Sequence, residues 1–293
     1  MAKGVFHSSR WFLILTVVVC GAFLSPLPSS AASTSAPDLG FIGADELGRT
    51  IQDWAILDAR PKSDWQAGRI AGARSFSWED YTTTDKNGKK FCLRSPEELA
   101  GALSAMGIDE NMPLVVYGDA DKSWGGEGWT CWVLSWLGHK GPIRLLAGGI
   151  RAWRDQKGPV GVEPEHPLSK TVHYQTNIRR EVDISASELE QEKEEIVLID
   201  TRSTKEWLMG HLPKAVHIEW TYFYTGKNRH PLDAAAFKKV LEDHGVDTSK
   251  PIVYYCTGGV RSGYSWTIHS IAGLPPARNY SGGMEDWSHR LSH

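Results

Sequence analysis

The stretch that decides the fold runs from Pro251 to Ser262 and reads PIVYYCTGGVRS. The apolar residues 252–255 predict a buried strand that ends at Cys256, and the two glycines that follow predict a short loop before a helix near Arg261. A cysteine between a strand and a helix N-terminus meets backbone N–H groups and the positive end of the helix dipole, and both favour its thiolate. The alternative is a small buried cysteine that only packs. The glycines and Arg261 favour a nucleophile with its own anion-binding loop.

The spacing between Cys256 and Arg261 narrows the chemistry, because four residues separate them. This Cys-x4-Arg loop resembles the active-site loop of rhodanese-type sulfurtransferases, in which the cysteine opens a six-residue loop. Tyrosine phosphatases and arsenate reductases have five intervening residues and often a His before the cysteine, where this chain has Tyr255. The longer loop surrounds a tetrahedral oxyanion, whereas the shorter loop fits one sulfur atom held as a persulfide. The resemblance therefore implies sulfur transfer rather than phosphoryl transfer.

An internal repeat extends the resemblance to most of the chain. Four residue types recur at an offset of 142 positions: Asp58/Asp200, Arg60/Arg202, Trp65/Trp207 and Gly68/Gly210. The run 114–118 matches the run 252–256, and a Gly-Gly-x-x-x-Trp pattern closes each copy, at Trp153 and at Trp287. This order of motifs resembles the rhodanese domain, and two copies cover about residues 38–293.

Each copy alternates short apolar runs with amphipathic segments, which is typical of a parallel sheet covered by helices. The predicted strands are residues 55–57, 114–117, 143–146, 196–199 and 252–255, and Ser95 and Ser185 each open a predicted helix as its N-cap. The predicted fold is α/β, with two tandem rhodanese-like domains that each have a parallel sheet flanked by helices on both faces. The domains are residues 38–157 and 178–293, and a linker with several prolines spans 158–177.

The two copies differ at the position of the nucleophile. Gly118 stands in the first copy where Cys256 stands in the second. The following loop is also longer, with 30 positions from Gly118 to Gly148 against 26 from Cys256 to Gly282. In two-domain members of this family the first domain is an inactive companion that forms one wall of the cleft. The resemblance implies the same arrangement here.

Residues 1–32 have the pattern of a secretory signal peptide. Lys3 and Arg10 flank the start of a 14-residue apolar run, residues 11–24, which is too short to span a bilayer, and small residues follow up to Ala32. Removing this segment leaves 30 of the 32 basic residues against 35 acidic ones, so the net formal charge changes from −3 to −5. The sequence predicts a periplasmic or secreted protein, with an uncleaved anchor as the alternative. Since no basic tract is present, neither nucleic-acid binding nor stable membrane association after cleavage is predicted.

Three cysteines remain after the predicted cleavage: Cys92, Cys131 and Cys256. An odd number outside the cytosol fits one disulfide and one reactive thiol, and Cys92 and Cys131 are then the candidate pair. Two unpaired buried thiols are the alternative. No Cys-x-x-Cys motif and no cluster of His or acidic residues has the spacing of metal ligands, so neither a metal nor another cofactor is predicted.

The predicted activity is transfer of a sulfane sulfur atom through a persulfide of Cys256. The thiolate attacks the outer sulfur of a small anionic donor, and a thiol, a thioredoxin-like protein or cyanide then takes the sulfur. Thiosulfate is favoured over 3-mercaptopyruvate because the predicted pocket is cationic. The loop predicted to bind the persulfide consists of Thr257, Gly258, Gly259, Val260 and Arg261, and the candidates for holding the donor are Arg202 and Arg261.

Alternatives stay open at two levels. Arg202 either binds the donor or has a structural role, in which it pairs with an acid such as Glu206. Asp58, Asp200 and Arg60 are interpreted as fold residues, because the inactive copy has the same Asp-x-Arg pattern. At the level of function, the second hypothesis is a persulfide carrier that delivers sulfur to a protein partner. The third, a phosphatase or arsenate reductase, is disfavoured by the loop length.

Overall fold

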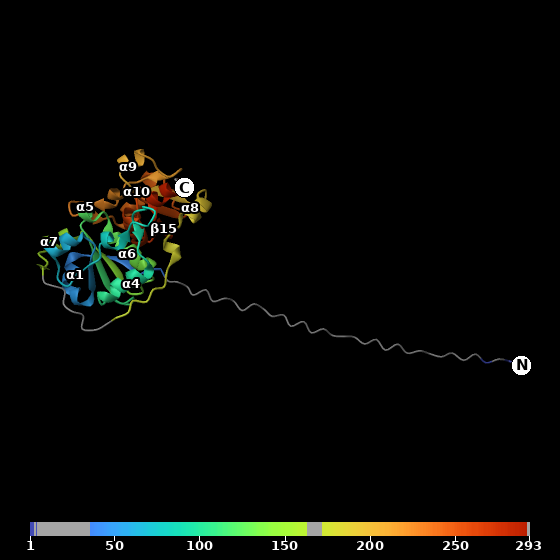
Figure 1. Ribbon diagram of the computed structural model, residues 1–293, viewed down its shortest axis with the longest axis horizontal. Helices are drawn as coiled ribbons and strands as arrows, with labels where there is room; N and C mark the ends of the chain where they lie inside the picture. The colour runs from blue at the N-terminus through green and yellow to red at the C-terminus, as the bar shows by residue number, and fades with distance from the viewer. Residues whose placement is uncertain (3, 5–35, 163–171, 292–293) are drawn as a thin grey trace. The chain divides into compact units, whose positions relative to one another are not determined.

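The computed structural model describes residues 1, 2, 4, 36–162 and 172–291. The predicted signal peptide, apart from three residues, and part of the predicted linker therefore lie outside the described residues. The chain divides into two units, Met1–Ser35 and Ala36–His293, and every described helix and strand belongs to the second (Figure 1). Among the described helices, none combines the length and the apolar character that crossing a membrane requires.

The first domain is built on a five-stranded sheet in which all neighbouring strands are parallel. The strand order is β1 (Leu39–Ile42), β8 (Ile143–Leu146), β7 (Leu114–Tyr117), β2 (Ala55–Asp58) and β4 (Arg74–Ser75). The helices of this domain are α1 (Ala44–Thr50), α2 (Lys62–Ala67), α3 (Trp78–Tyr81), α4 (Pro96–Ala105), α5 (Ala120–Ser123), α6 (Gly126–Trp136) and α7 (Gly149–Asp155). The predicted strands of this domain are confirmed to within one residue, and the sequence patterns do not predict β1 and β4.

The second domain repeats this plan with one strand fewer. Its sheet is also parallel, in the order β11 (Val216–His217), β10 (Val197–Asp200), β14 (Ile252–Tyr255) and β15 (Ala277–Tyr280). Its helices are α8 (Ala186–Glu192), α9 (Thr204–Leu208), α10 (Ala234–Asp243), α11 (Val260–Ile271) and α12 (Gly283–Leu291). A single parallel bridge between Asp183 and Asn279 lies where the first domain has β1. The predicted α/β class with two domains is therefore confirmed.

Short elements complete the fold. Three two-residue antiparallel pairs lie outside the main sheets: β3 (Arg69–Ile70) with β9 (Val160–Gly161), β5 (Thr82–Thr83) with β6 (Cys92–Leu93), and β12 (Tyr224–Thr225) with β13 (His230–Pro231). The 3-10 turns in the described ranges are Ile51–Asp53, Arg180–Val182 and Trp220–Phe223. The two predicted N-caps are confirmed, because Ser95 and Ser185 each form a capping box with the Glu three residues later.

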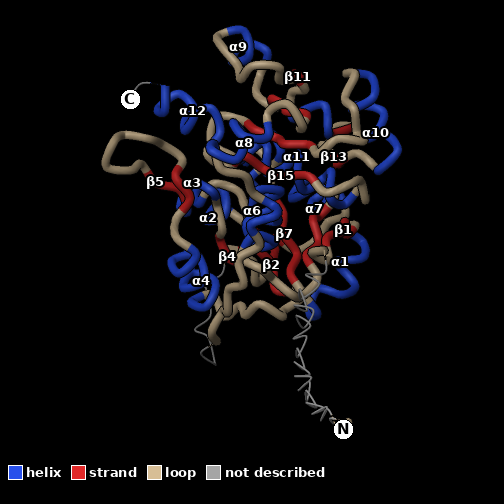
Figure 2. Tube along the Cα trace, turned by 90° about the vertical axis from the view of Figure 1, so that its right-hand side faces the viewer, coloured by secondary structure: helices blue, strands red, loops and turns tan. Residues whose placement is uncertain are grey.

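Both faces of each sheet carry an apolar cluster, and the central strands supply them alternately. In β7, Leu114 and Val116 belong to one cluster, whereas Val115 and Tyr117 belong to another. The strand β14 repeats this pattern along residues 252–255. Successive side chains of a strand point to opposite faces, so a run that is apolar throughout buries both faces under helices (Figure 2).

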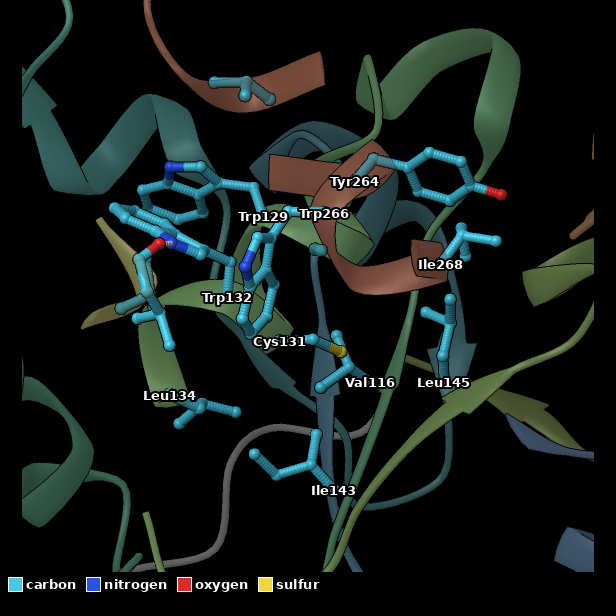
Figure 3. Packing of buried hydrophobic residues seen from close by; sticks show 14 of the residues in the cluster. Val116, Trp129, Cys131, Trp132, Leu134, Ile143, Leu145, Tyr264, Trp266 and Ile268 are labelled. Atoms are coloured by element: carbon cyan, nitrogen blue, oxygen red, sulfur yellow. Dashed lines mark hydrogen bonds between the residues drawn. The ribbon is translucent and has the colours of Figure 1, made fainter. Parts of the chain in front are cut away.

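One of these clusters is shared by the two domains. It contains Trp129 and Trp132 of α6 and Tyr264 and Trp266 of α11, all buried (Figure 3). The indole N–H of Trp132 donates to the carbonyl of Val182 at 3.0 Å, so its polar atom is satisfied within the apolar surroundings. The helical spacing of these tryptophans therefore reflects packing of α6 between the domains.

The contact between α6 and α11 depends on glycine. A Cβ atom on Gly128 of α6 would lie 2.4 Å from the Cα of Tyr264, a distance that no side chain tolerates. On α11, a Cβ atom on Gly263 would lie 3.1 Å from the Cα of Trp129. The Thr267 hydroxyl donates to the Gly128 carbonyl at 2.8 Å across the same contact. Two backbones therefore approach closely where the two domains meet.

Both ends of the predicted linker, residues 158–177, are bonded to the first domain. The strand β9 lies within the predicted linker 158–177, yet it pairs with β3, so the first domain extends to Gly161. At the other end, the Asn177 N–H donates to the carbonyl of Leu137 at 2.9 Å, which holds that part of the segment against the first domain. Prolines mark the segment in the sequence but do not reveal the backbone pairing, because strands of two residues give no periodic signal.

We expect Gly128→Ala to lower the free energy of unfolding by about 1–3 kcal/mol, because the added methyl group forces α6 and α11 apart. Gly101→Ala is the matched control. Gly101 also lies inside a helix, but its Cβ position is open, so alanine should be neutral or stabilising by up to about 1 kcal/mol. Urea denaturation of both variants measures the difference, and equal stability of the two would contradict the close contact.

Candidate active site

Cys256 lies at the carboxyl end of β14, where ligands bind in open parallel sheets. The residue is 1% exposed, and α11 begins four positions later at Val260. Gly259 has a φ of 83° at the N-cap, and a Cβ atom there would lie 2.5 Å from the carbonyl oxygen of Ser281. This position therefore needs glycine for two reasons, its left-handed backbone and its lack of space. The strand, loop and helix predicted from the sequence are confirmed.

The helix α12 donates hydrogen bonds to the carbonyl groups of Cys256 and Thr257. The N–H of Met284 donates to the carbonyl of Cys256 at 2.8 Å, and the N–H of Glu285 donates to that of Thr257 at 3.0 Å. By contrast, none of the backbone N–H groups of residues 257–262 donates to an acceptor in the described part of the chain. The loop therefore keeps its donors free for a ligand while its acceptors are used, which is the arrangement an anion requires.

A hydrogen-bonded ion pair forms the charged side of the site. The Arg261 guanidinium donates to both carboxylate oxygens of Glu206, at 2.7 Å each, and to the hydroxyl of Thr257 at 2.8 Å. The same hydroxyl donates to Glu206 at 2.8 Å. Glu206 is fixed in turn by the N-terminus of α9, where it forms a capping box with Ser203. Both partners are therefore held by more than one bond, and the pair is bidentate.

The ion pair determines the charge state of its members. Burial alone would raise the pKa of the Glu206 carboxyl, but hydrogen bonds from Arg261 and Ser203, together with the guanidinium charge, lower it well below its usual value. Burial would also lower the pKa of Arg261, but its bonds to Glu206 and the charge of Cys256 raise it. Glu206 is therefore ionised at neutral pH. Its negative charge neutralises Arg261, the residue that the sequence predicts to bind an anionic donor.

Aromatic side chains of the first domain form the opposite wall. A pocket of about 330 Å³ above Cys256 is lined by Trp78, Phe91 and Trp124, together with Glu206 and residues of the Cys256 loop. Phe91 packs closely against the loop, since a Cβ atom on Gly258 would lie 2.3 Å from the Cβ of Phe91. The first domain thus forms one wall of the cleft, as the family resemblance implied.

Two of these aromatic residues have an unusual backbone. Phe91 has a φ of 58° and Trp124 a φ of 54°, in the left-handed region that bulky residues rarely adopt. Such conformations cost about 1–3 kcal/mol each and persist where the surrounding structure requires them. Trp124 is 54% exposed, and its ring lies 5.9 Å from the guanidinium carbon of Arg261. Trp124 therefore contributes to the wall of the pocket and not to the hydrophobic core.

Arg202 lies in a different environment from Arg261. Its guanidinium binds both carboxylate oxygens of Asp200 and donates to the carbonyl of Gly210 at 2.7 Å. Arg60 makes the same bonds in the first domain, to Asp58 and to the carbonyl of Gly68. Arg202 is also not among the residues that line the pocket. Because the copy without a nucleophile repeats these bonds, the structure favours the structural role of Arg202 over donor binding, with Asp200 rather than Glu206 as its partner.

The site of the first domain is filled by its own chain. A Cβ atom on Gly118 would lie 2.3 Å from a carboxylate oxygen of Glu127, so Glu127 of α6 occupies the space that a cysteine side chain would need. The Tyr224 hydroxyl donates to the other oxygen at 2.6 Å. The oxygen near Gly118 is buried and has no hydrogen-bond partner among the described residues. Burial accordingly raises the pKa of Glu127.

All three described cysteines are free thiols. Cys131 is buried inside the shared core on α6, whereas Cys92 lies on β6 and is partly exposed, with its sulfur 3.4 Å from the Lys89 carbonyl. Burial raises the pKa of both thiols. In the structure Cys92 and Cys131 are therefore unpaired, and of the two only Cys131 is buried. No group of three or more His, Cys, Asp or Glu residues in the described ranges is arranged to hold a metal ion.

The structure places Cys256, the loop that follows it and Arg261 at one pocket. Glu206, Trp78, Phe91 and Trp124 also line this pocket, and the sequence does not identify them as site residues. Glu206 was visible as the last residue of a Ser-x-x-Glu capping box, which signals a helix start and not a site. The aromatic residues lie in a different domain from Cys256, so no local spacing connects them with it. The packing of α6 on α11 brings the two domains together, and bonds from Lys89 to Asp286 and from the N–H of Lys90 to Glu285 also hold the segment before Phe91 against α12.

Comparison with known proteins agrees with this geometry. A family model described as Rhodanese-like domain matches residues 43–156 and 185–290. The chain is 28% identical over 245 residues to a sulfur carrier protein of Thermus thermophilus, which covers 76% of this chain and 83% of the relative. It is 26% identical over 284 residues to the 3-mercaptopyruvate sulfurtransferase of Escherichia coli, covering 85% and 95%. It is 24% identical over 274 residues to the thiosulfate sulfurtransferase of Gallus gallus, covering 84% and 90%.

Solved structures show the same fold. The crystal structure of SseA from Escherichia coli superposes with a TM-score of 0.73 at 21% identity, covering 83% of this chain and 98% of that one.

The buried carboxyl of Glu127 generates a pH-dependent prediction. A folded-state pKa raised above the usual 4.5 means that the protonated form stabilises the fold; this contribution is complete below the unfolded pKa and is lost as pH rises through the folded pKa. Glu127→Gln keeps the shape and stays neutral. It should therefore match the wild type near pH 4 and exceed it by about 1–3 kcal/mol near pH 9.

Urea denaturation at both pH values measures this difference, with Glu242→Gln on the exposed face of α10 as the control for loss of one carboxyl. If Glu127→Gln were less stable than the wild type even at high pH, Glu127 would be ionised and bound in the folded protein.

Proposed function

The chain belongs to the rhodanese family, its relatives support an enzyme of the sulfurtransferase class, and we propose that it moves a sulfane sulfur atom through a persulfide on Cys256. The observation that carries this proposal is the loop of residues 257–262, whose backbone N–H groups have no acceptor among the described residues. A loop of this length surrounds one atom rather than a phosphoryl group. The outer sulfur of a persulfide is an anion of that size.

The reaction balances with the residues present. The Cys256 thiolate attacks the outer sulfur of the donor and forms an S–S bond, while the bond between that sulfur and the rest of the donor breaks. The electron pair leaves on sulfite if the donor is thiosulfate, or on the enolate of pyruvate if it is 3-mercaptopyruvate, and the enolate then takes a proton from water. An acceptor such as a thiolate or cyanide attacks the same sulfur, the S–S bond breaks, and the Cys256 thiolate returns.

The protein contributes positioning and charge stabilisation to both steps. The free N–H groups of the loop stabilise the persulfide anion at fixed positions, so no solvent needs to reorganise as charge moves onto the outer sulfur. Two bonds from α12 to the loop carbonyls keep these donors oriented. Phe91, packed on Gly258, closes one side of the pocket against water.

The charge of the pocket changes the preference among donors. The sequence favours thiosulfate because it shows no partner for the Arg261 cation, but Glu206 neutralises Arg261 in the structure. With Cys256 as a thiolate, the charges of the pocket residues sum to one negative charge, which disfavours a dianion. We therefore place an organic monoanion such as 3-mercaptopyruvate ahead of thiosulfate. The aromatic wall of Trp78, Phe91 and Trp124 suits the carbon skeleton of such a donor.

A sulfur carrier is the second candidate function. One observation favours it: Trp124 at the mouth of the pocket is 54% exposed, and exposed aromatic side chains are frequent at protein interfaces. A relative at 28% identity is a sulfur carrier protein. In this case the acceptor is a protein thiol, such as that of a thioredoxin-like partner. The signal-peptide pattern supports export, so the proposed partner is periplasmic or extracellular.

The persulfide itself is tested by intact mass. The purified protein should gain the mass of one sulfur atom on treatment with 3-mercaptopyruvate or thiosulfate and lose it on addition of cyanide. Cys256→Ala should gain nothing, and its circular dichroism should stay unchanged because the substitution only removes a small side chain. Turnover with cyanide compared with a thioredoxin-like dithiol separates the enzyme from the carrier. Sulfur on Cys256→Ala would contradict the proposal.

The donor preference is tested by Glu206→Gln. Glutamine retains the capping box and still accepts a bond from Arg261, but it frees one positive charge in the pocket. We expect kcat/KM for thiosulfate to rise by about tenfold relative to that for 3-mercaptopyruvate. Glu242→Gln, on α10, controls for the change in net charge. An unchanged ratio of the two kcat/KM values would show that the ion pair does not select the donor.

A further inference from the structure

The first domain covers one of its tryptophans with its own chain. After α7, Gly158 lies flat on the indole of Trp153, where a Cβ atom would be 2.2 Å from the ring. The Trp153 N–H donates to the carbonyl of Pro159 at 3.0 Å. The next residue, Val160, is paired with Ile70 in the β3–β9 ladder. This cover, the segment Gly158 to Gly161, leaves Trp153 only 2% exposed.

The second domain has the same receiving surface. Trp287 occupies the position of Trp153 in the repeat, and Leu212 occupies that of Ile70. Even a detail of the backbone recurs: the N–H of Leu212 donates to the hydroxyl of Tyr255 at 3.1 Å, as the N–H of Ile70 does to that of Tyr117 at 3.2 Å. The two sites are therefore built alike up to the covering segment.

No described residue covers the site in the second domain. Trp287 is only partly buried, and its indole N–H has no acceptor among the described residues. Gly68 has the methyl group of Val160 3.1 Å from its Cβ position, whereas the equivalent Gly210 has nothing within 4 Å. A groove of about 400 Å³ lies here instead, which we call the Trp287 groove; it is lined by Leu189, Ile196, Leu198, Leu212, Pro213 and Trp287.

The surroundings of the groove resemble an interface. Leu208 and Met209, which immediately precede Gly210 in the chain, are 78% and 80% exposed, which is unusual for large apolar side chains. The charged residues at the groove are paired with one another: Lys193 with Glu190, and Lys214 with Glu194. Since the described charged residues that line the groove are all paired, an uncharged apolar segment fits it better than an ionic one.

We propose that the Trp287 groove binds an extended segment of a partner protein in which Gly-Pro precedes a β-branched apolar residue. The segment takes the place that Gly158 to Gly161 take in the first domain. Its glycine lies on the indole of Trp287, its proline carbonyl accepts from the indole N–H, and its apolar side chain fills the space beside Gly210 and Leu212. The groove shares α12 with the Cys256 loop, because the N-terminus of this helix holds the loop carbonyls.

The first domain supplies the probe. A synthetic peptide KGPVGV, with the sequence of residues 157–162 and blocked ends, should shift the indole N–H resonance of Trp287 in a nitrogen-15 correlation spectrum of the full chain. Comparison with Trp287→Phe assigns that resonance. The peptide KAPVGV should bind at least tenfold more weakly, because its added Cβ would meet the ring. Trp287→Phe, which keeps an aromatic ring but lacks the N–H, should weaken KGPVGV by several-fold.

Other results would overturn the proposal. Absence of binding at millimolar peptide, equal binding of KGPVGV and KAPVGV, or binding that Trp287→Phe leaves unchanged would each do so. Concentration-dependent dimerisation that the Trp287→Phe variant abolishes would assign the groove to a second copy of the chain instead. The Cys256→Ala variant should bind KGPVGV as the wild type does, so failure here is distinguishable from failure of the persulfide proposal.

Discussion

The close approach of α6 and α11 is the constraint on which the site depends. The helix α6 begins at Gly126, two positions after Trp124, and α11 begins at Val260, within the loop that follows Cys256. Glycines at Gly128 and Gly263 let the two backbones meet, and a Cβ atom on Gly125, at the start of α6, would also lie 2.9 Å from Tyr264. Packing two helices at their first turns places the loop of one domain against the loop of the other. A cleft with a thiol on one wall and aromatic rings on the other follows from that contact.

The two domains use one scaffold for two purposes. In both domains, the Arg of the Asp-x-Arg motif binds the Asp at the end of β2 or β10 and the carbonyl of a glycine in the following turn. Because both domains have these bonds, we assign them a structural role. At the end of the next strand the domains differ. In one, Cys256 precedes a loop whose N–H groups have no acceptor among the described residues; in the other, Gly118 leaves room for the carboxyl of Glu127. The carboxyl of Glu127 thus occupies the space that a cysteine side chain would take at position 118. The first domain is therefore filled at this position, although it has no nucleophile there.

Much of the fold could be predicted from the sequence, because its determinants are local. Apolar runs such as 252–255 mark strands, Ser95 and Ser185 mark helix starts, and the repeat fixes the domain plan. The nucleophile and its loop could be predicted for the same reason. The ion pair of Arg261 could not, because Glu206 lies 55 positions away and carries a capping signal of its own. The aromatic wall could not be predicted either. Phe91 and Trp124 reach the site through the contact between the domains and through a left-handed backbone conformation, and neither feature has a sequence pattern in this chain.

The central claim is that the loop of residues 257–262 exists to hold one sulfur atom on Cys256. A crystal structure of the protein treated with 3-mercaptopyruvate tests it most directly. We predict an additional sulfur atom bonded to the Sγ of Cys256 and accepting hydrogen bonds from several of the loop N–H groups, with the bidentate pair of Arg261 and Glu206 intact. An additional sulfur that points away from the loop into solvent, or loop N–H groups that bind protein acceptors instead, would contradict it.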